Sequence, residues 1–126
     1  MTDAHASYAE TFTSIVGDDT APAIMDWVKS EMREELTSIP RIGRVTADCF
    51  KRAGIETSYA LLGKFLSLKS AGCSPVEHCE RFWIWVESAT KENRIIKRDK
   101  AAICRCIFLK ADILMPGLYE EDAYRG

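Results

Sequence analysis

The sequence predicts an all-α protein, and three observations support this fold class. Proline and glycine fall mostly between segments of helical periodicity, so little of the chain is left for strands. Within those segments, apolar residues recur three or four positions apart, as on one face of a helix. The 126 residues are enough for one domain with a single hydrophobic core. We therefore expect a compact domain of five helices.

Residues at the ends of the periodic segments indicate where the helices begin and end. In the first segment, Asp and Thr residues precede a proline, a combination typical of a helix start. Gly54 ends the second helix, and Thr57 or Ser58 is the N-cap of the third. Pro116 and Gly117 stop the last helix. The five helices are expected within residues 18–36, 44–53, 58–68, 75–90 and 97–114.

These helices divide the chain into three parts. Residues 1–19 are expected to form an N-terminal extension with one short amphipathic segment that includes His5. Residues 20–115 form the domain, and residues 116–126 form a loose acidic tail. No internal repeat or low-complexity tract interrupts this organisation.

Composition argues against several classes of protein. Hydrophobic residues make up 47% of the chain, yet no apolar run approaches the length of a membrane span, and the start does not resemble a secretory signal. The five cysteines have no repeated spacing, so we expect reduced thiols; Cys73, His78 and Cys79 lack the paired spacing of a zinc site. We expect no metal and no cofactor. His5 and His78 have no nucleophile at motif spacing and are placed in a loose terminus and a linker, so we do not expect an enzyme.

Two tryptophans suggest contact with another molecule. Trp83 and Trp85 cannot both face the core of a straight helix, because they lie about 200° apart around its axis. One of them is therefore expected at the surface or at an interface. Together with the apolar stretch ALLGKFLSL, this favours an oligomer.

The stretch IPRIG, residues 39–43, predicts a tight turn between two helices. Pro40 disfavours a helical conformation in the residue before it, and Gly43 permits the backbone angles of a turn directly before the next helix. The start of that helix presents free N–H groups to an anion such as phosphate. Apolar residues are expected to anchor the turn from inside, and two arginines to flank it; these are Ile39, Ile42, Val45 and Phe50, and Arg41 and Arg44.

This turn resembles the helix-hairpin-helix motif, and the following residues resemble the barrier-to-autointegration factor family. The segment AGIETSYALLGKFLSLK, residues 53–69, matches that family at the junction of the hairpin and the next helix. Farther along, ERFWIWVESAT keeps the pair Phe82 and Trp85, and NRIIKRDKAAIC keeps Asn93, Arg98 and Asp99. The resemblance covers roughly residues 20–114.

The resemblance implies a homodimer that binds and bridges double-stranded DNA without sequence preference. It implies DNA contacts from the hairpin around Gly43, with Ile42 and Val45, and from Arg98 at the start of the last helix. Arg41, Arg44 and Lys97 are expected to replace phosphate contacts of the family that this sequence lacks. It implies a dimer or partner groove that includes Leu62, Gly63, Leu66 and Trp85. Family members also hold LEM domains of inner nuclear membrane proteins, so the implied location is the nucleus, in chromatin or at the nuclear envelope; without the resemblance we expect the cytoplasm. No direct membrane insertion is expected.

Departures from the family pattern keep a second hypothesis open. The third hairpin residue, commonly glycine, is Arg41, and a lysine of the family's second hairpin helix is Cys49, with Asp48 beside it. Lys51 and Arg52 are candidate replacements. Ser67 stands where the family has an apolar groove residue, which weakens the expectation of LEM-domain binding. The alternative is a dimeric protein-interaction module of the same fold that has lost DNA binding.

Overall fold

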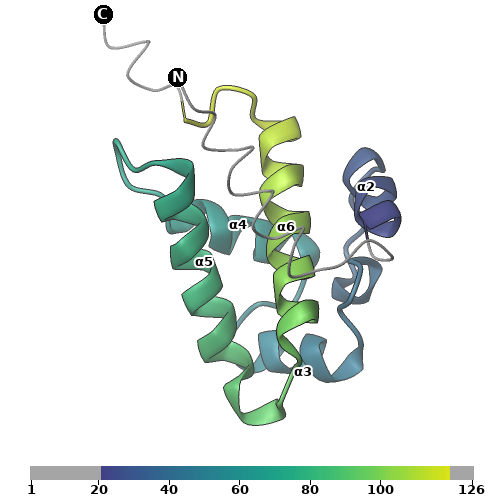
Figure 1. The fold of residues 1–126 in the computed structure, drawn as a ribbon. Helices are drawn as coiled ribbons and strands as arrows, with labels where there is room; N and C mark the ends of the chain where they lie inside the picture. Colours follow the sequence, from purple (N-terminus) through teal and green to yellow (C-terminus); the bar gives the residue numbers. More distant parts are fainter. Residues whose placement is uncertain (1–20, 120–126) are drawn as a thin grey trace, which may run out of the picture.

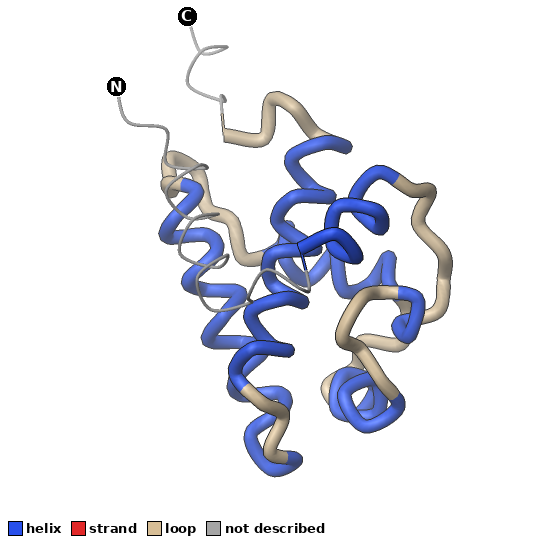
Figure 2. Tube along the Cα trace, turned by 45° about the vertical axis from the view of Figure 1, so that its right-hand side comes forward, coloured by secondary structure: helices blue, strands red, loops and turns tan. Residues whose placement is uncertain are grey.

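The structure is a computed structural model that describes residues 21–119, and over this range its regular secondary structure is all helical. Figure 2 shows helices and loops with no strand between these residues. This confirms the predicted all-α domain of five helices. The elements in chain order are α2 (Ala21–Lys29), the 3₁₀ turn η1 (Leu36–Ser38), α3 (Arg44–Arg52), α4 (Ser58–Ser67), α5 (Pro75–Thr90), the 3₁₀ turn η2 (Lys91–Asn93) and α6 (Lys97–Leu114).

Helix α6 is the centre of the domain. It packs against α2, α4 and α5, as the ribbon in Figure 1 shows. Small residues on α6 let the neighbouring helices approach closely, and larger apolar residues fill the remaining space. The buried apolar residues of α6 are Ala101, Ala102, Ile103, Cys104, Cys106, Ile107, Phe108 and Ala111.

Local signals account for the helix ends that were predicted correctly. The Thr57 side chain accepts a hydrogen bond from the backbone N–H of Ala60 at 3.0 Å and so caps α4. Ser74 and Glu77 form a reciprocal capping box at the start of α5. Helices α5 and α6 have the predicted bounds, and α3 ends at Arg52, just before Gly54, whose φ is 89°.

The first helix is shorter than predicted, because it ends at Lys29 rather than near residue 36. The expected helix start before Pro22 lies outside the described residues. The buried ammonium group of Lys110 donates hydrogen bonds to the carbonyls of Trp27 at 2.9 Å, Val28 at 2.8 Å and Ser30. These carbonyls at the end of α2 are therefore hydrogen-bonded by Lys110 without a further turn of helix.

The chain after α2 is held by α4 instead of continuing as a helix. The backbone N–H of Ser58 donates to the Glu34 carbonyl at 2.8 Å, and its hydroxyl donates to the carbonyl of Arg33. The Tyr59 hydroxyl donates to the Met32 carbonyl at 2.9 Å. These bonds from α4 satisfy the carbonyls of residues 32–34 without a further turn of helix, and residues 30–35 are irregular.

The prediction that His78 lies in a linker is wrong. His78 lies on α5, is completely buried and stacks on Phe65, with ring centroids 3.9 Å apart. Its Nε2 bonds to the Phe65 carbonyl, and its Nδ1 lies 2.6 Å from the hydroxyl of Tyr119. Because Tyr119 and Leu118 pack against the core, the prediction of a loose tail is wrong for these two residues. Residues 120–126 and the extension at residues 1–19 lie outside the described part.

Both tryptophans of α5 are half-buried against the domain, so neither is fully exposed, and the expectation of an interface at one of them stays a prediction. Trp85 stacks on Phe50 of α3 at 5.4 Å, whereas Trp83 lies beneath the ammonium group of Lys100 at 6.0 Å. They can both be half-buried because α5 lies between α3 and α6. The large apolar side chain that α5 exposes is Ile84, which has 65% of its surface exposed.

The five cysteines are buried and reduced. Burial raises the pKa of the Cys106 thiol to about 12 and raises the pKa values of Cys79 and Cys104 still further. Among residues 21–119, no three His, Cys, Asp or Glu side chains are grouped so that they could hold a metal ion. Nor does any helix in this range have the length and apolar character needed to cross a membrane.

Candidate nucleic-acid interface

The predicted turn is present, but the residue with unusual backbone angles is Arg41. The backbone N–H of Ile42 donates to the Ile39 carbonyl at 3.1 Å and closes a turn in which Pro40 is second and Arg41 is third. Arg41 has a φ of 68°, in the left-handed region that favours glycine at this turn position. Gly43 has a φ of −92°, which any residue adopts. The expectation that Gly43 supplies the special turn geometry is therefore wrong.

The turn is anchored in the core by three of the four apolar residues expected there. Ile39, Ile42 and Phe50 are buried, whereas Val45 keeps 52% of its surface exposed. The buried residues of α3 are Thr46, Ala47, Cys49 and Phe50, and Val45 lies outside this face. The prediction that Val45 faces inward is therefore corrected.

The left-handed conformation of Arg41 predicts a difference between two truncations. Both Arg41→Gly and Arg41→Ala remove the charged side chain, but only alanine keeps a β-carbon in a conformation that disfavours it. Urea unfolding is expected to show Arg41→Gly more stable than Arg41→Ala by about 1 kcal/mol. If the alanine variant were equally or more stable, residue 41 would not hold this conformation in solution.

The structure brings the starts of α3 and α6 together. The Nε of Arg41, in the turn before α3, lies 3.8 Å from the Oδ1 of Asp99, in the first turn of α6. No side chain caps either helix: the N-caps are Gly43 and Ile96, and neither makes a side-chain hydrogen bond. A β-carbon on Gly43 would meet nothing within 4 Å, so the space over the start of α3 is open. Two helix N-termini without side-chain caps are therefore linked by the ion pair between Arg41 and Asp99.

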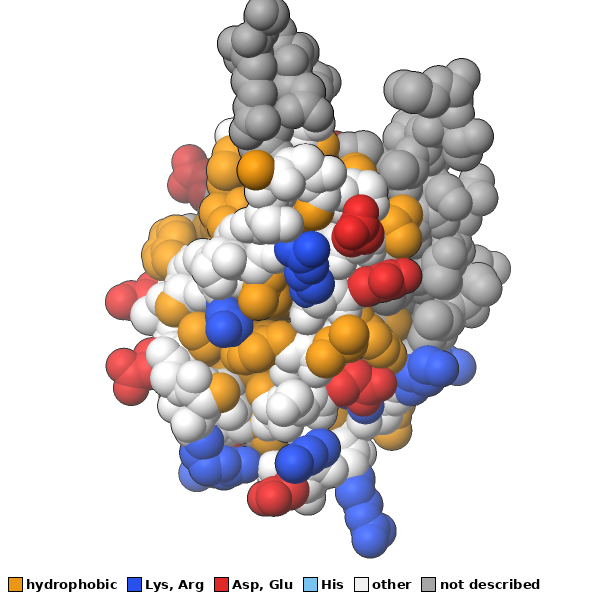
Figure 3. Space-filling view, turned by 90° about the vertical axis from the view of Figure 1, so that its left-hand side faces the viewer, with side chains coloured by type: hydrophobic (Ala, Val, Ile, Leu, Met, Phe, Trp, Pro, Cys, Tyr) orange, Lys and Arg blue, Asp and Glu red, His pale blue; other side chains and the backbone are white. Residues whose placement is uncertain are grey.

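Exposed basic side chains surround these two helix starts. Figure 3 shows Lys and Arg side chains gathered at the end of the molecule where α3 and the start of α6 lie. The predicted contacts Arg41, Arg44, Lys97 and Arg98 are all exposed there, while Ile42 is buried and can offer only its backbone. Arg94, which was not predicted as a contact, is also exposed between η2 and α6. Its position in the basic stretch NRIIKRDK, which also contains Lys97 and Arg98, could have indicated it.

Lys100 and Arg52 have partners elsewhere, and Lys51 lies among glutamates. Lys100 forms an ion pair with Glu87 at 2.5 Å. Lys51 lines a pocket together with three glutamates, Glu34, Glu35 and Glu56. Arg52 donates to the Oδ1 of Asn93 at 2.9 Å. Lys51 and Arg52 are therefore poor replacements for the missing phosphate contacts.

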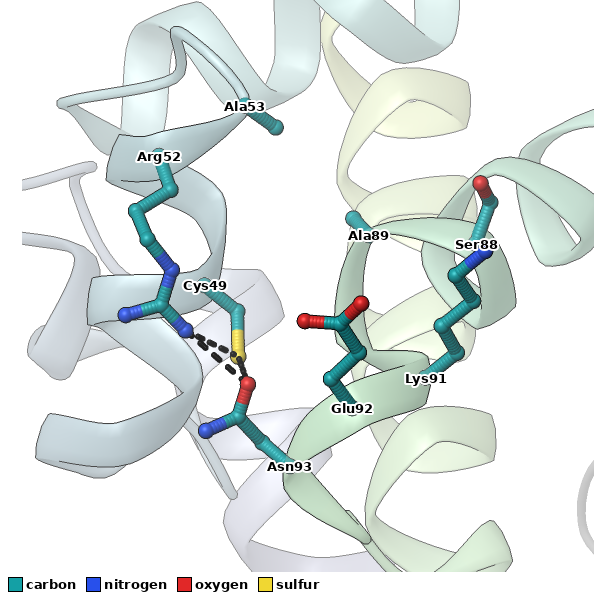
Figure 4. A pocket seen from close by; sticks show the side chains of 8 residues that line it. All are labelled: Cys49, Arg52, Ala53, Ser88, Ala89, Lys91, Glu92 and Asn93. Atoms are coloured by element: carbon teal, nitrogen blue, oxygen red, sulfur yellow. Dashed lines mark hydrogen bonds between the residues drawn. The ribbon is translucent and has the colours of Figure 1, made fainter.

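Cys49, Arg52 and Asn93 join α3 to η2, as Figure 4 shows. The thiol of Cys49 donates to the same Asn93 oxygen at 3.2 Å, and the guanidinium of Arg52 lies 3.7 Å from the sulfur. A pocket of about 240 Å³ lies at this junction. The contacts of Cys49 are structural, because they fix the hairpin relative to the connection that leads into α6.

The predicted dimer or groove residues do not form one surface. Leu62 lines a groove of about 800 Å³ that also includes Tyr59, Ile113 and Leu114, all more than half exposed. Trp85 instead contacts Lys64, at 5.7 Å, and Lys64 lies about 200° around α4 from Leu62. Gly63 is exposed and Leu66 is half-buried. Leu62 and Trp85 therefore face different sides of α4.

Comparisons with models of known protein families, with curated proteins and with solved structures find no match to this chain.

Proposed function

We propose that the protein binds the phosphate backbone of double-stranded DNA without sequence preference. The observation that carries this proposal is the pair of adjacent helix N-termini at α3 and α6, without side-chain caps and surrounded by exposed arginine and lysine. Such N-termini favour anions, and phosphates of a duplex are regularly spaced anions. The resemblance to the barrier-to-autointegration factor family supports the same assignment.

The overall charge of −2 is compatible with this role, because the charges are unevenly distributed. Arg41, Arg44, Lys97 and Arg98 lie at the starts of α3 and α6, and local potential rather than the total charge attracts a polyanion. Backbone contacts of this kind carry no sequence information. Binding is therefore expected to be non-specific and sensitive to salt.

We further propose that a homodimer bridges two duplexes, in chromatin or at the nuclear envelope, and that the protein is not an enzyme. The groove beside Leu62, with the exposed side chains of Tyr59, Ile113 and Leu114, supports a second copy as its occupant. Sedimentation is expected to give about twice the chain mass of 14.2 kDa; a monomer would contradict bridging by a dimer.

The second candidate function is a protein-interaction module without DNA affinity. The same groove favours it, as does the structural engagement of Cys49 with Asn93 where the family has a lysine. LEM-domain-like partners belong to this proposal. The two candidates differ in whether charge at the start of α6 affects binding to a duplex.

Charge reversal at Arg98 tests the DNA-binding proposal. Arg98→Glu removes one phosphate contact and adds repulsion, so affinity for a labelled random-sequence duplex at low salt is expected to fall on the order of tenfold. Fluorescence anisotropy measures this change. The matched control is Lys69→Glu, because the ammonium group of Lys69 lies 5.7 Å from the ring of Tyr119, beyond the far end of α6 and outside the groove, and its reversal should change affinity little. Equal effects of the two reversals, or no binding by the wild type, would contradict the proposal.

A further inference from the structure

At the basic end of the domain, Asp99 forms an ion pair with one of the proposed phosphate contacts. Asp99 is the third residue of α6, and its Oδ1 lies 3.8 Å from the Nε of Arg41. The side chains keep 39% of their surface exposed for Arg41 and 27% for Asp99. A phosphate bound between the starts of α3 and α6 would therefore meet this carboxylate.

Asp99 occupies the same kind of position that a phosphate would take. The first turn of a helix stabilises negative charge, whether this charge comes from a side chain or from a ligand. The Oδ1 of Asp99 is buried and has no hydrogen-bond donor within residues 21–119, so its neighbouring charge is the guanidinium of Arg41. The Asp99 carboxylate thus competes with a bound phosphate for the guanidinium of Arg41 and for the favourable electrostatic field at the start of α6.

The ion pair is weak enough for a ligand to displace. A partly exposed pair at this separation contributes about 0 to 1 kcal/mol, because water and salt screen it. A phosphate with several basic partners can therefore replace Asp99 as the partner of Arg41. The negative charge of Asp99 nevertheless remains close to the bound phosphate and opposes it.

We propose that Asp99 is an intramolecular competitor that limits the affinity of the α3 and α6 starts for phosphodiester backbones. This inference rests on the proposed function and adds a regulatory residue to the same site. In the free protein Asp99 holds Arg41, and on binding Arg41 exchanges the carboxylate for a phosphate. Removing the charge of Asp99 then strengthens DNA binding, whereas removing a residue that helps to position the site would weaken it.

The variant Asp99→Asn tests the inference by anisotropy with a random-sequence duplex of fixed length. Affinity at low salt is expected to rise about three- to tenfold, because a repulsion across a few ångströms is removed. The matched control is Glu80→Gln, an equal change of charge at an exposed residue near the start of α5, at the opposite end of the domain from the start of α6. This control should change affinity by less than about twofold, owing to screening over that distance.

A second pair of variants separates competition for Arg41 from general repulsion. In an Arg41→Gln background, the gain from Asp99→Asn should shrink, since the arginine that Asp99 occupies is gone. Unchanged or weaker binding by Asp99→Asn, with normal binding by the wild type, would overturn the inference and leave the proposed function intact. If neither the wild type nor Asp99→Asn binds at low salt, both fail. Binding by Asp99→Asn alone would support the inference in its strongest form.

Discussion

Replacing Lys110 with methionine is expected to lower the free energy of unfolding by about 3 to 5 kcal/mol. Lys110 keeps only 2% of its surface exposed, and its ammonium group bonds to three carbonyls at the end of α2 while lying 4.6 Å from the ring of Trp27. Methionine fills a similar volume but cannot donate, so the buried Val28 carbonyl loses the Lys110 hydrogen bond, while the Trp27 carbonyl keeps only its bonds from the N–H and hydroxyl of Ser30. Thermal unfolding should shift down on the order of 10 °C.

The matched control is Lys29→Met, which changes an exposed lysine in the last turn of α2. This change should alter the free energy of unfolding by about 0.5 kcal/mol or less. Urea unfolding of both variants gives the comparison. A Lys110→Met protein as stable as Lys29→Met would show that the ammonium group does not hold α2 against α6.

The stability of the domain is expected to fall as the pH decreases below 6.5, because His78 is buried in its neutral form. The Phe65 carbonyl can only accept, so Nε2 carries the proton and Nδ1 accepts from the Tyr119 hydroxyl. Burial lowers the pKa of His78 from its ordinary value of 6.5, and the bond to Phe65 opposes this shift only in part. The nearby cations Lys69 and Arg81 lower this pKa further.

The direction of the pH effect follows from which state takes up the proton. Below pH 6.5 the histidine of the unfolded chain becomes protonated while the folded one does not, so protons favour unfolding. The loss is at most about 1.4 kcal/mol per pH unit, or about 2 kcal/mol at pH 5, and it ends once the pH passes below the lowered pKa of the folded state. Above pH 6.5 this group has no influence.

The variant His78→Gln serves as the control for this pH dependence. Its amide can donate to the Phe65 carbonyl and accept from Tyr119, but it does not titrate. Urea unfolding at pH 7.5, 6.0 and 5.0 is expected to show a smaller decline for the variant than for the wild type. Parallel declines would mean that other groups, rather than His78, govern the acid sensitivity.

Much of the fold follows from local signals in the sequence. A capping box and a proline mark the start of α5, and a proline-glycine pair follows α6, so these two helix ends follow from local signals. The end of α2 could not be predicted in this way. It depends on hydrogen bonds from Lys110, 80 residues or more along the chain, and from α4. The local sequence pattern of residues 30–36 does not indicate these bonds.

The candidate site was predicted in position but not in detail. The turn, the exposed Arg41 and Arg44, and the start of α6 lie where the sequence placed them. The left-handed backbone of Arg41 was missed because Gly43 is the residue type that usually takes such angles. The adjacency of Arg41 and Asp99, 58 positions apart in the chain, arises only from packing of the helices.

The salt dependence of wild-type binding to a random-sequence duplex tests the central claim most directly. With three to five phosphate contacts in each chain, the logarithm of the association constant should fall against the logarithm of salt concentration with a slope of about −3 to −4.5. Two unrelated duplex sequences should give the same line. Absence of binding at low salt, or an affinity that does not change with salt, would contradict the account and leave a helical domain whose partner is another protein.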